Sequence, residues 1–224
     1  MRYKRIVSIG AHSLDAELQG GPVMIKAAKH GARCTMVHVT SGRLEDPQAT
    51  ESEKQAYLEQ IFTENDKAAS GMGCDVYRMN YLSRDLPTIP DFIEILKDYF
   101  IDEDVDLVIS HARGTLHPRH YYCYETVTEA VRQLEAEGRQ IELWYGENCE
   151  DLAGFSPTKY IPLEEDEVKT WFDSLSSYAI FQGKVNNVPY QSYYQSMLTV
   201  RAFEVGSKKP VKAYMTAPHL DNLS

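Results

Sequence analysis

The stretch Arg5-Ile6-Val7-Ser8-Ile9-Gly10 decides the fold, because this short apolar run ends in glycine and is typical of a buried strand. A second run rich in β-branched residues follows at residues 32–40. Between them, Pro22 is a residue favoured at the first position of a helix, and Gly31 is typical of a helix end. We therefore expect a loop at residues 12–21, followed by a helix. The N-terminal part therefore predicts strand, loop, helix and strand.

The same alternation continues along the chain. Further strands are predicted at residues 74–79, 106–110 and 141–146, and further helices at residues 50–70, 89–99, 118–136, 166–182 and 190–205. Strands that alternate with helices favour a parallel sheet covered by helices on both faces. We therefore predict an α/β fold, a single-domain Rossmann-like and mostly parallel sheet, over residues 1–224.

Composition excludes several classes of protein. The net charge of −10, with dispersed lysines and arginines, opposes binding to nucleic acid. No segment approaches the ~20 consecutive apolar residues of a membrane span, and the first apolar run is too short for a signal peptide, so we expect a cytoplasmic protein without a membrane partner. The cysteines have no paired spacing, which argues against both a disulfide framework and a cysteine-ligated zinc site.

Two histidine clusters carry the chemistry, at residues 11–18 and 117–120. Both follow predicted strands, and the carboxyl ends of parallel strands meet at the edge of a sheet where ligands bind. Together His12, Asp15 and His120 supply two imidazoles and one carboxylate, a set that suits catalytic Zn²⁺ with a position left open for water. The same set suits Fe²⁺, so zinc is the default and ferrous iron the alternative.

These clusters resemble the PIG-L/LmbE-like family of zinc-dependent N-deacetylases. The family's first motif, Ala-His-Pro-Asp-Asp-x-Glu followed by Gly-Gly, is similar to residues 11–17 and Gly20-Gly21, and its His-x-Asp-His motif is similar to residues 117–120. Residues 145–151 and 154–157 resemble an acidic Glu-Asn segment and a Gly-Phe-x-Pro segment of one branch. The resemblance implies an LmbE-like fold and removal of acetyl from an N-acetylglucosamine conjugate or a related N-acetylated sugar.

Carried over residue by residue, the resemblance implies metal ligands at His12, Asp15 and His120, and a catalytic role for His117 on the tetrahedral intermediate or the leaving amine. Two positions depart from the family pattern. Leu14 replaces the aspartate that acts as general base, and Arg119 replaces the aspartate before the last histidine.

The departure at Leu14 bears on turnover, because general base assistance is typically worth about 10²–10⁴ in rate. His117 is the replacement we favour, and the acidic alternatives are Glu17, Glu147, Glu150 and Asp151. Arg119 either points away from the metal or binds an anionic group such as a carboxylate or phosphate. The predicted substrate contacts are Arg113, Arg119 and Leu14.

Other interpretations stay open. A family member that has lost catalysis would keep the pocket for a sugar-like ligand or a protein partner. A dinucleotide-binding domain is disfavoured, because no Gly-x-Gly-x-x-Gly turn follows the first strand. By analogy with the family, the chain can form a homo-oligomer. Structural roles are expected for His38, His111 and His219.

Overall fold

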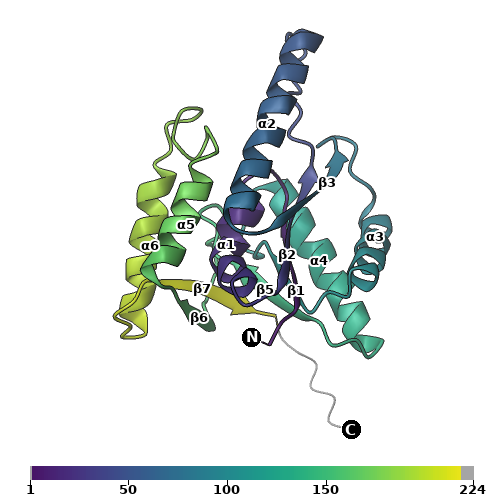
Figure 1. The fold of residues 1–224 in the computed structure, drawn as a ribbon. Coiled ribbons are helices and arrows are strands. Elements are labelled where there is room, and N and C mark those ends of the chain that lie inside the picture. Colours follow the sequence, from purple (N-terminus) through teal and green to yellow (C-terminus); the bar gives the residue numbers. More distant parts are fainter. Residues whose placement is uncertain (1, 218–224) are drawn as a thin grey trace.

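Seven strands form one sheet in the computed structural model, which describes residues 2–217 (Figure 1). The sheet order is β3-β2-β1-β4-β5-β7-β6; the first five strands of the chain pair in parallel, and β7 pairs antiparallel with both β5 and β6. The strands are β1 (Arg5–Gly10), β2 (Arg33–Thr40), β3 (Asp75–Tyr81), β4 (Leu107–Ser110), β5 (Glu142–Gly146), β6 (Lys159–Pro162) and β7 (Val211–Thr216).

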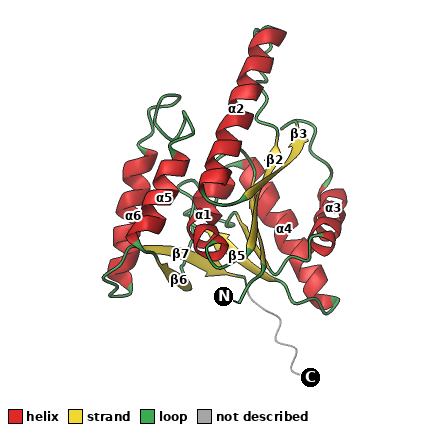
Figure 2. Cartoon of the chain, in the orientation of Figure 1, coloured by secondary structure: helices red, strands yellow, loops and turns green. Residues whose placement is uncertain are grey.

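Helices cover both faces of this sheet (Figure 2). The helices are α1 (Asp15–Ala28), α2 (Glu51–Gly71), α3 (Ile89–Asp102), α4 (Pro118–Ala136), α5 (Glu165–Leu175) and α6 (Tyr190–Glu204). The first core cluster joins one face to α1, α2, α5 and α6 and includes Ile6, Leu14, Met36, Trp171 and Tyr214. The second core cluster joins the other face to α3 and α4 and includes Val7, Ile9, Phe92, Val127 and Leu143. The predicted α/β architecture is confirmed.

The central strand β1 shows why the sequence reads as an unbroken apolar run. Ile6 belongs to the first core cluster, whereas Val7 and Ile9 belong to the second. Every residue of β1 is buried. A strand buried on both faces has no polar side to alternate with, so its apolar residues follow one another without a break.

The first helix begins earlier than predicted: α1 starts at Asp15, and Pro22 lies inside it. The predicted loop at residues 12–21 is therefore wrong over most of its length. The pair Gly20-Gly21 packs closely, because a Cβ on the first glycine would lie 2.5 Å from the Cβ of Ser8, and one on the second would lie 2.7 Å from Nε1 of Trp171. Contacts with the sheet and with α5 hold the helix in place and override the local Gly-Gly-Pro signal.

The C-terminal third differs from the prediction in two further ways. The helix predicted to reach residue 182 ends at Leu175, and the strands β6 and β7 were not predicted. Only four residues form β6, and its last residue is Pro162, so its local signal is weak. The remaining predicted elements are confirmed to within a few residues, and α4 matches its predicted bounds.

Within residues 2–217, no helix has the length and apolar character required to cross a membrane. Each of the four cysteines is a free thiol. His219 lies outside the described residues.

Candidate metal and active site

The first half of the candidate site forms where β1 ends and α1 begins. Leu14 has a φ of 83°, in the left-handed region that costs a non-glycine residue about 1–3 kcal/mol. This turn brings Asp15 back to His12: Asp15 Oδ2 accepts a hydrogen bond from the backbone N–H of His12 over 2.8 Å and lies 3.2 Å from His12 Nδ1. Gly10 permits the close approach, because a Cβ there would lie 2.5 Å from the backbone nitrogen of Ala16.

The second half forms where β4 leads into α4. His117 precedes the helix and makes no capping hydrogen bond with its side chain, and His120 lies in the first turn. Because β1 and β4 are neighbouring parallel strands, their carboxyl ends lie side by side. His120 Nε2 is 3.4 Å from Asp15 Oδ2. The two histidine clusters therefore converge on Asp15.

Two overlapping sets of donor atoms are close enough together to hold one cation. The donor atoms of His12, His117 and His120 lie within 4.8 Å of one another, and so do those of Asp15, His111 and His120. The predicted ligands His12, Asp15 and His120 draw on both sets. Imidazole and carboxylate together suit Zn²⁺ or Fe²⁺, so the chemistry of the donors fits a metal. Which of these side chains bind it remains a prediction.

A buried carboxylate orients His120. Asp151 follows β5 and is fully buried, and its Oδ1 accepts a hydrogen bond from His120 Nδ1 over 2.9 Å. The other ring nitrogen of His120, Nε2, faces Asp15. Histidines that bind metal commonly donate their other ring N–H to a carboxylate in this way. This pairing therefore fits a histidine that binds a metal.

His111 belongs to the site although we expected only a structural role for it. The backbone N–H of Ala11 donates to His111 Nε2 over 3.0 Å, so Nδ1 carries the proton and donates to Asp151 Oδ2 over 2.7 Å. Because Nε2 is already engaged, His111 serves as a support for Asp151 rather than as a free ligand. No spacing in the sequence indicates this contact; Asp151 was named only among acids in a segment that resembles the family.

The electrostatics of the cluster favour ionised carboxylates. Burial alone would raise the pKa of Asp15, but the neighbouring imidazoles of His120 and His12 hold it well below its ordinary value. Burial lowers the pKa of His120, yet the carboxylates of Asp15 and Asp151 outweigh it and raise that pKa to about 10. Burial, followed by the charges of His120 and His12, lowers the pKa of His117 to about 4. The site thus presents negative oxygens beside clustered imidazoles.

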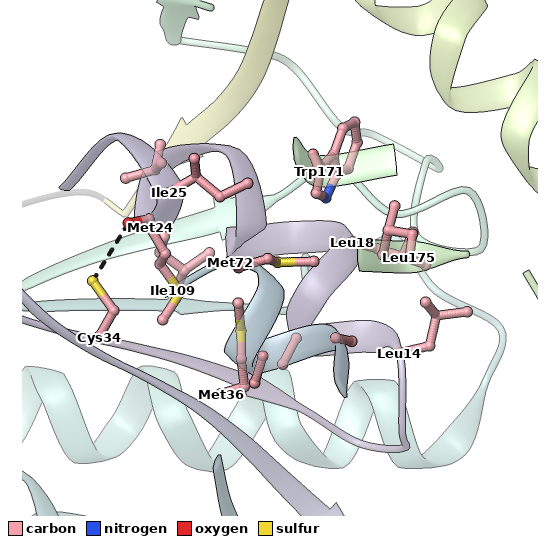
Figure 3. Close-up of a cluster of buried hydrophobic side chains, with 14 of the residues drawn as sticks. Leu14, Leu18, Met24, Ile25, Cys34, Met36, Met72, Ile109, Trp171 and Leu175 are labelled. Carbon is pink, nitrogen blue, oxygen red and sulfur yellow. Dashed lines mark hydrogen bonds between the residues drawn. The ribbon is translucent and has the colours of Figure 1, made fainter. Parts of the chain in front are cut away.

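Leu14 is buried in the first core cluster. Its side chain is 4% exposed, and Figure 3 shows it among the buried apolar side chains of that cluster, such as Leu18 and Leu175. Its left-handed backbone is a conformation that aspartate and asparagine adopt more readily than leucine. The predicted contact of Leu14 with a substrate remains a prediction.

Among the acids considered as replacement bases, Glu17 and Glu147 are committed elsewhere. Glu17 is fully buried, and its Oε1 accepts from Tyr178 and lies 2.9 Å from Nε2 of His38. Glu147 is paired with Arg201. These contacts occupy both carboxylates in structural networks.

Glu150 is the acid with the freest side chain at the site. It is half-exposed, and its Oε2 lies 3.6 Å from His120 Nε2. The ring centroid of His117 is 4.8 Å from that of His12, and within residues 2–217 its Nδ1 is buried without a hydrogen-bond partner. The geometry therefore leaves His117 and Glu150 as two groups able to take a proton from water.

A cavity of about 220 Å³ adjoins His12. It is lined by His12, residues 40–45, Tyr57 and Ser83. Arg119 donates from Nη2 to the carbonyl of Ser83 over 3.3 Å, so its guanidinium is directed to this side and not to Asp15. Arg113 is exposed on the loop before His117. The predicted substrate contacts of both arginines remain predictions.

Comparison with known proteins gives one family match. The model of the family described as PIG-L: GlcNAc-PI de-N-acetylase matches residues 7–131, which include both histidine clusters. A search of curated protein sequences gave no match.

Solved structures share the whole fold. The N,N'-diacetylchitobiose deacetylase from Pyrococcus horikoshii has a TM-score of 0.74 at 14% sequence identity. The alignment covers 100% of this chain and 88% of the deacetylase chain. GalB, the 4-carboxy-2-hydroxymuconate hydratase from Pseudomonas putida KT2440, has a TM-score of 0.75 at 16% sequence identity, and the alignment covers 99% of this chain and 100% of the GalB chain. The zinc-inhibited form of teicoplanin deacetylase Orf2 has a TM-score of 0.72 at 11% sequence identity, and the alignment covers 96% of this chain and 100% of the Orf2 chain. Identities this low show a common fold alone.

Proposed function

Because this chain belongs to the PIG-L family of de-N-acetylases, we propose that it is a metal-dependent hydrolase that removes an acetyl group from an N-acetylated sugar or sugar conjugate. The observation that carries the proposal is the convergence of His12, His120 and Asp15, with His120 oriented by Asp151. The fold alone does not select this reaction, since one protein of the same fold is a hydratase.

In this proposal His12, Asp15 and His120 hold the cation and His117 faces the reacting centre. A divalent cation bound there supplies Lewis acidity, which polarises the acyl oxygen and makes water more acidic. Asp151 accepts a hydrogen bond from Nδ1 of His120 and so keeps Nε2 directed towards Asp15. Zn²⁺ is the default cation and Fe²⁺ the alternative, and the zinc-inhibited neighbour is a reason to test both.

The missing aspartate at Leu14 leaves proton transfer to another group. We propose His117 for this role, because its Nδ1 is buried without a partner among the described residues and its ring centroid lies 4.8 Å from that of His12 and 4.5 Å from that of His120. Glu150 is the competing candidate, since it is the half-exposed acid nearest to His120 Nε2. Arg113, Arg119 and Leu14 are proposed to contact the substrate.

The direct test is acetate release from a panel of N-acetylglucosamine conjugates by protein loaded with Zn²⁺ or Fe²⁺. We expect release by the wild type and its loss in His120→Ala, together with loss of bound metal. His30→Ala is the matched control, because the His30 side chain is exposed and, among the described residues, its one hydrogen bond is to the carbonyl of Lys26. Silence across the panel with metal bound would count against deacetylation.

The second candidate function is binding without catalysis, favoured by one observation: the position of the family's base holds a buried leucine. A retired enzyme of this kind would bind a sugar-like ligand or a protein partner and release no acetate with any cation. Cytoplasmic location, the absence of a nucleic-acid or membrane partner and assembly as a homo-oligomer remain predictions.

A further inference from the structure

A buried amide lies against the carboxylate of Asp15. It belongs to Asn148, which follows the end of β5 and is 1% exposed. Its Nδ2 donates a hydrogen bond to Asp15 Oδ1 over 3.2 Å, and the two residues are 133 positions apart in the sequence. This contact ties the loop after β5 to the first histidine motif.

The neighbouring backbone fixes which way round this amide lies. Oδ1 of Asn148 accepts from the backbone N–H of Glu150 over 3.1 Å. A side-chain amide has an acceptor oxygen at one end and donors at the other, and its orientation follows from its hydrogen-bond partners. A flipped amide would place its oxygen against Asp15 Oδ1 and its NH₂ against an N–H. The donor end of Asn148 therefore faces Asp15.

The residues on either side of Asn148 hold it in place. The carbonyl of Glu147 accepts from Nζ of Lys212 over 2.9 Å, which ties the loop to β7. The backbone N–H of Cys149 donates to the hydroxyl of Tyr194 over 3.2 Å, which ties it to α6. A polar side chain held on both sides in this way is preorganised for its partner.

The two carboxylate oxygens of Asp15 consequently have different surroundings. Oδ1 accepts from the amide of Asn148. Oδ2 accepts from the backbone N–H of His12 over 2.8 Å and lies 3.4 Å from Nε2 of His120. Carboxylates bind cations through one oxygen or through both. Here Oδ2 is the oxygen that faces the imidazoles, and the amide holds the other one.

We propose that Asn148 is a positioning residue that makes Asp15 bind the cation through Oδ2 alone. The inference rests on the proposed function in placing a cation at Asp15. With one oxygen from Asp15 and one nitrogen each from His12 and His120, three protein atoms hold the cation. A fourth position then stays open for water, as it does in catalytic zinc sites. Binding through both oxygens of Asp15 would use that position.

The test is the visible absorption spectrum of the protein loaded with Co²⁺ in place of Zn²⁺. Four-coordinate Co²⁺ absorbs more strongly, and at longer wavelength, than Co²⁺ with five or six ligands. We expect the strong four-coordinate spectrum for the wild type. Asn148→Ala frees Oδ1 of Asp15, so its spectrum should lose intensity and shift to shorter wavelength. A residue that served only the turn of the loop would leave the spectrum unchanged.

Asn148→Leu is the second variant, because its side chain excludes a water molecule that could take the place of the amide after substitution by alanine. It should show the same loss and shift. Thermal unfolding of both variants checks that they remain folded, and the spectrum is read on whichever of them does.

Asn186→Ala is the matched control. Asn186 makes the same two kinds of contact in the exposed loop before α6: its Oδ1 accepts from the backbone N–H of Val188 over 3.2 Å, and its Nδ2 donates to the hydroxyl of Tyr190 over 3.0 Å. Its substitution should leave the Co²⁺ spectrum as in the wild type. A wild-type spectrum in folded Asn148 variants would overturn the proposal, and so would an equal change in Asn186→Ala.

Acetate release, measured on the same samples, separates this inference from the proposed function. Acetate release together with unchanged spectra in the Asn148 variants would leave deacetylation standing and remove the role of Asn148. The expected spectral change without acetate release from any probe would do the reverse. A wild-type protein that takes up no Co²⁺ would contradict both.

Discussion

His120 donates from Nδ1 to Asp151 over 2.9 Å, and the same carboxylate accepts from His111 over 2.7 Å through its other oxygen. One buried acid thus orients a proposed metal ligand and is itself held from the opposite side. Asp151 comes from the loop after β5, whereas both histidines follow β4. The geometry of the candidate site therefore depends on a segment outside both histidine motifs.

Asp151→Asn should weaken metal binding by about 10- to 100-fold, because loss of an outer carboxylate lowers the basicity and the alignment of the ligand it supports. A competition titration against a chelator measures the affinity. Asp173→Asn, a change in an exposed acid of α5 that pairs with Lys169, is the control and should leave it unchanged. Unaltered affinity in Asp151→Asn would show that His120 is not oriented by this contact.

His117→Asn should lower kcat by about 10²–10⁴ while the protein retains its metal, since a group that transfers a proton acts on the rate and not on the affinity for the cation. Steady-state kinetics with metal analysis of the same preparation makes the measurement. Glu150→Gln is the contrasting variant and should change kcat by less than about tenfold. The opposite ranking of the two variants would assign proton transfer to Glu150.

Leu14→Asp should raise kcat by about 10² and lower the melting temperature. The rate rises because a carboxylate returns to the position of the family's base. The stability falls because a buried leucine is lost from the first core cluster. Leu14→Asn is the control, since it has the same shape and suits the same backbone but cannot act as a base. Equal rates in the two variants would favour the non-catalytic interpretation.

Lys212 should make stability depend on pH. Burial lowers its pKa from 10.5 to about 8, so between these values the unfolded chain binds more protons than the folded one. Stability from this group is therefore lowest below about pH 8 and rises from pH 8 towards 10.5, by an amount on the order of 3 kcal/mol. Urea unfolding at pH 7, 8 and 9.5 tests this. As pH rises, the unfolding free energy of the wild type should increase relative to that of Lys212→Met. A difference that stays constant with pH would contradict it.

The core of the fold was predictable because its signals are local. Buried parallel strands such as β1 and β4 are apolar runs, and the helices between them have recognisable ends. The start of α1 was not predictable, because Gly20-Gly21 and Pro22 read locally as a helix boundary, whereas packing on Ser8 and Trp171 keeps them helical. The strands β6 and β7 depend on antiparallel pairing with β5, which no short stretch of sequence indicates.

The candidate site divides in the same way. The structure brings together His12, Asp15, His117 and His120, which motif spacing identified. It adds His111, for which the sequence holds no pattern, and gives a supporting position to Asp151, which the sequence placed only among several acids. Their contacts arise where the loops after β4 and β5 meet, so they follow from strand order and not from spacing along the chain.

In the described chain, β7 is the strand nearest to the C-terminus, and in the sheet it lies between β5 and β6. Nζ of Lys212 on β7 donates to the carbonyl of Glu147 over 2.9 Å. During translation both histidine motifs therefore leave the ribosome long before the strand that secures the loop carrying Asp151. A polypeptide terminated ahead of residue 211 lacks the Lys212 contact to the loop that carries Asp151.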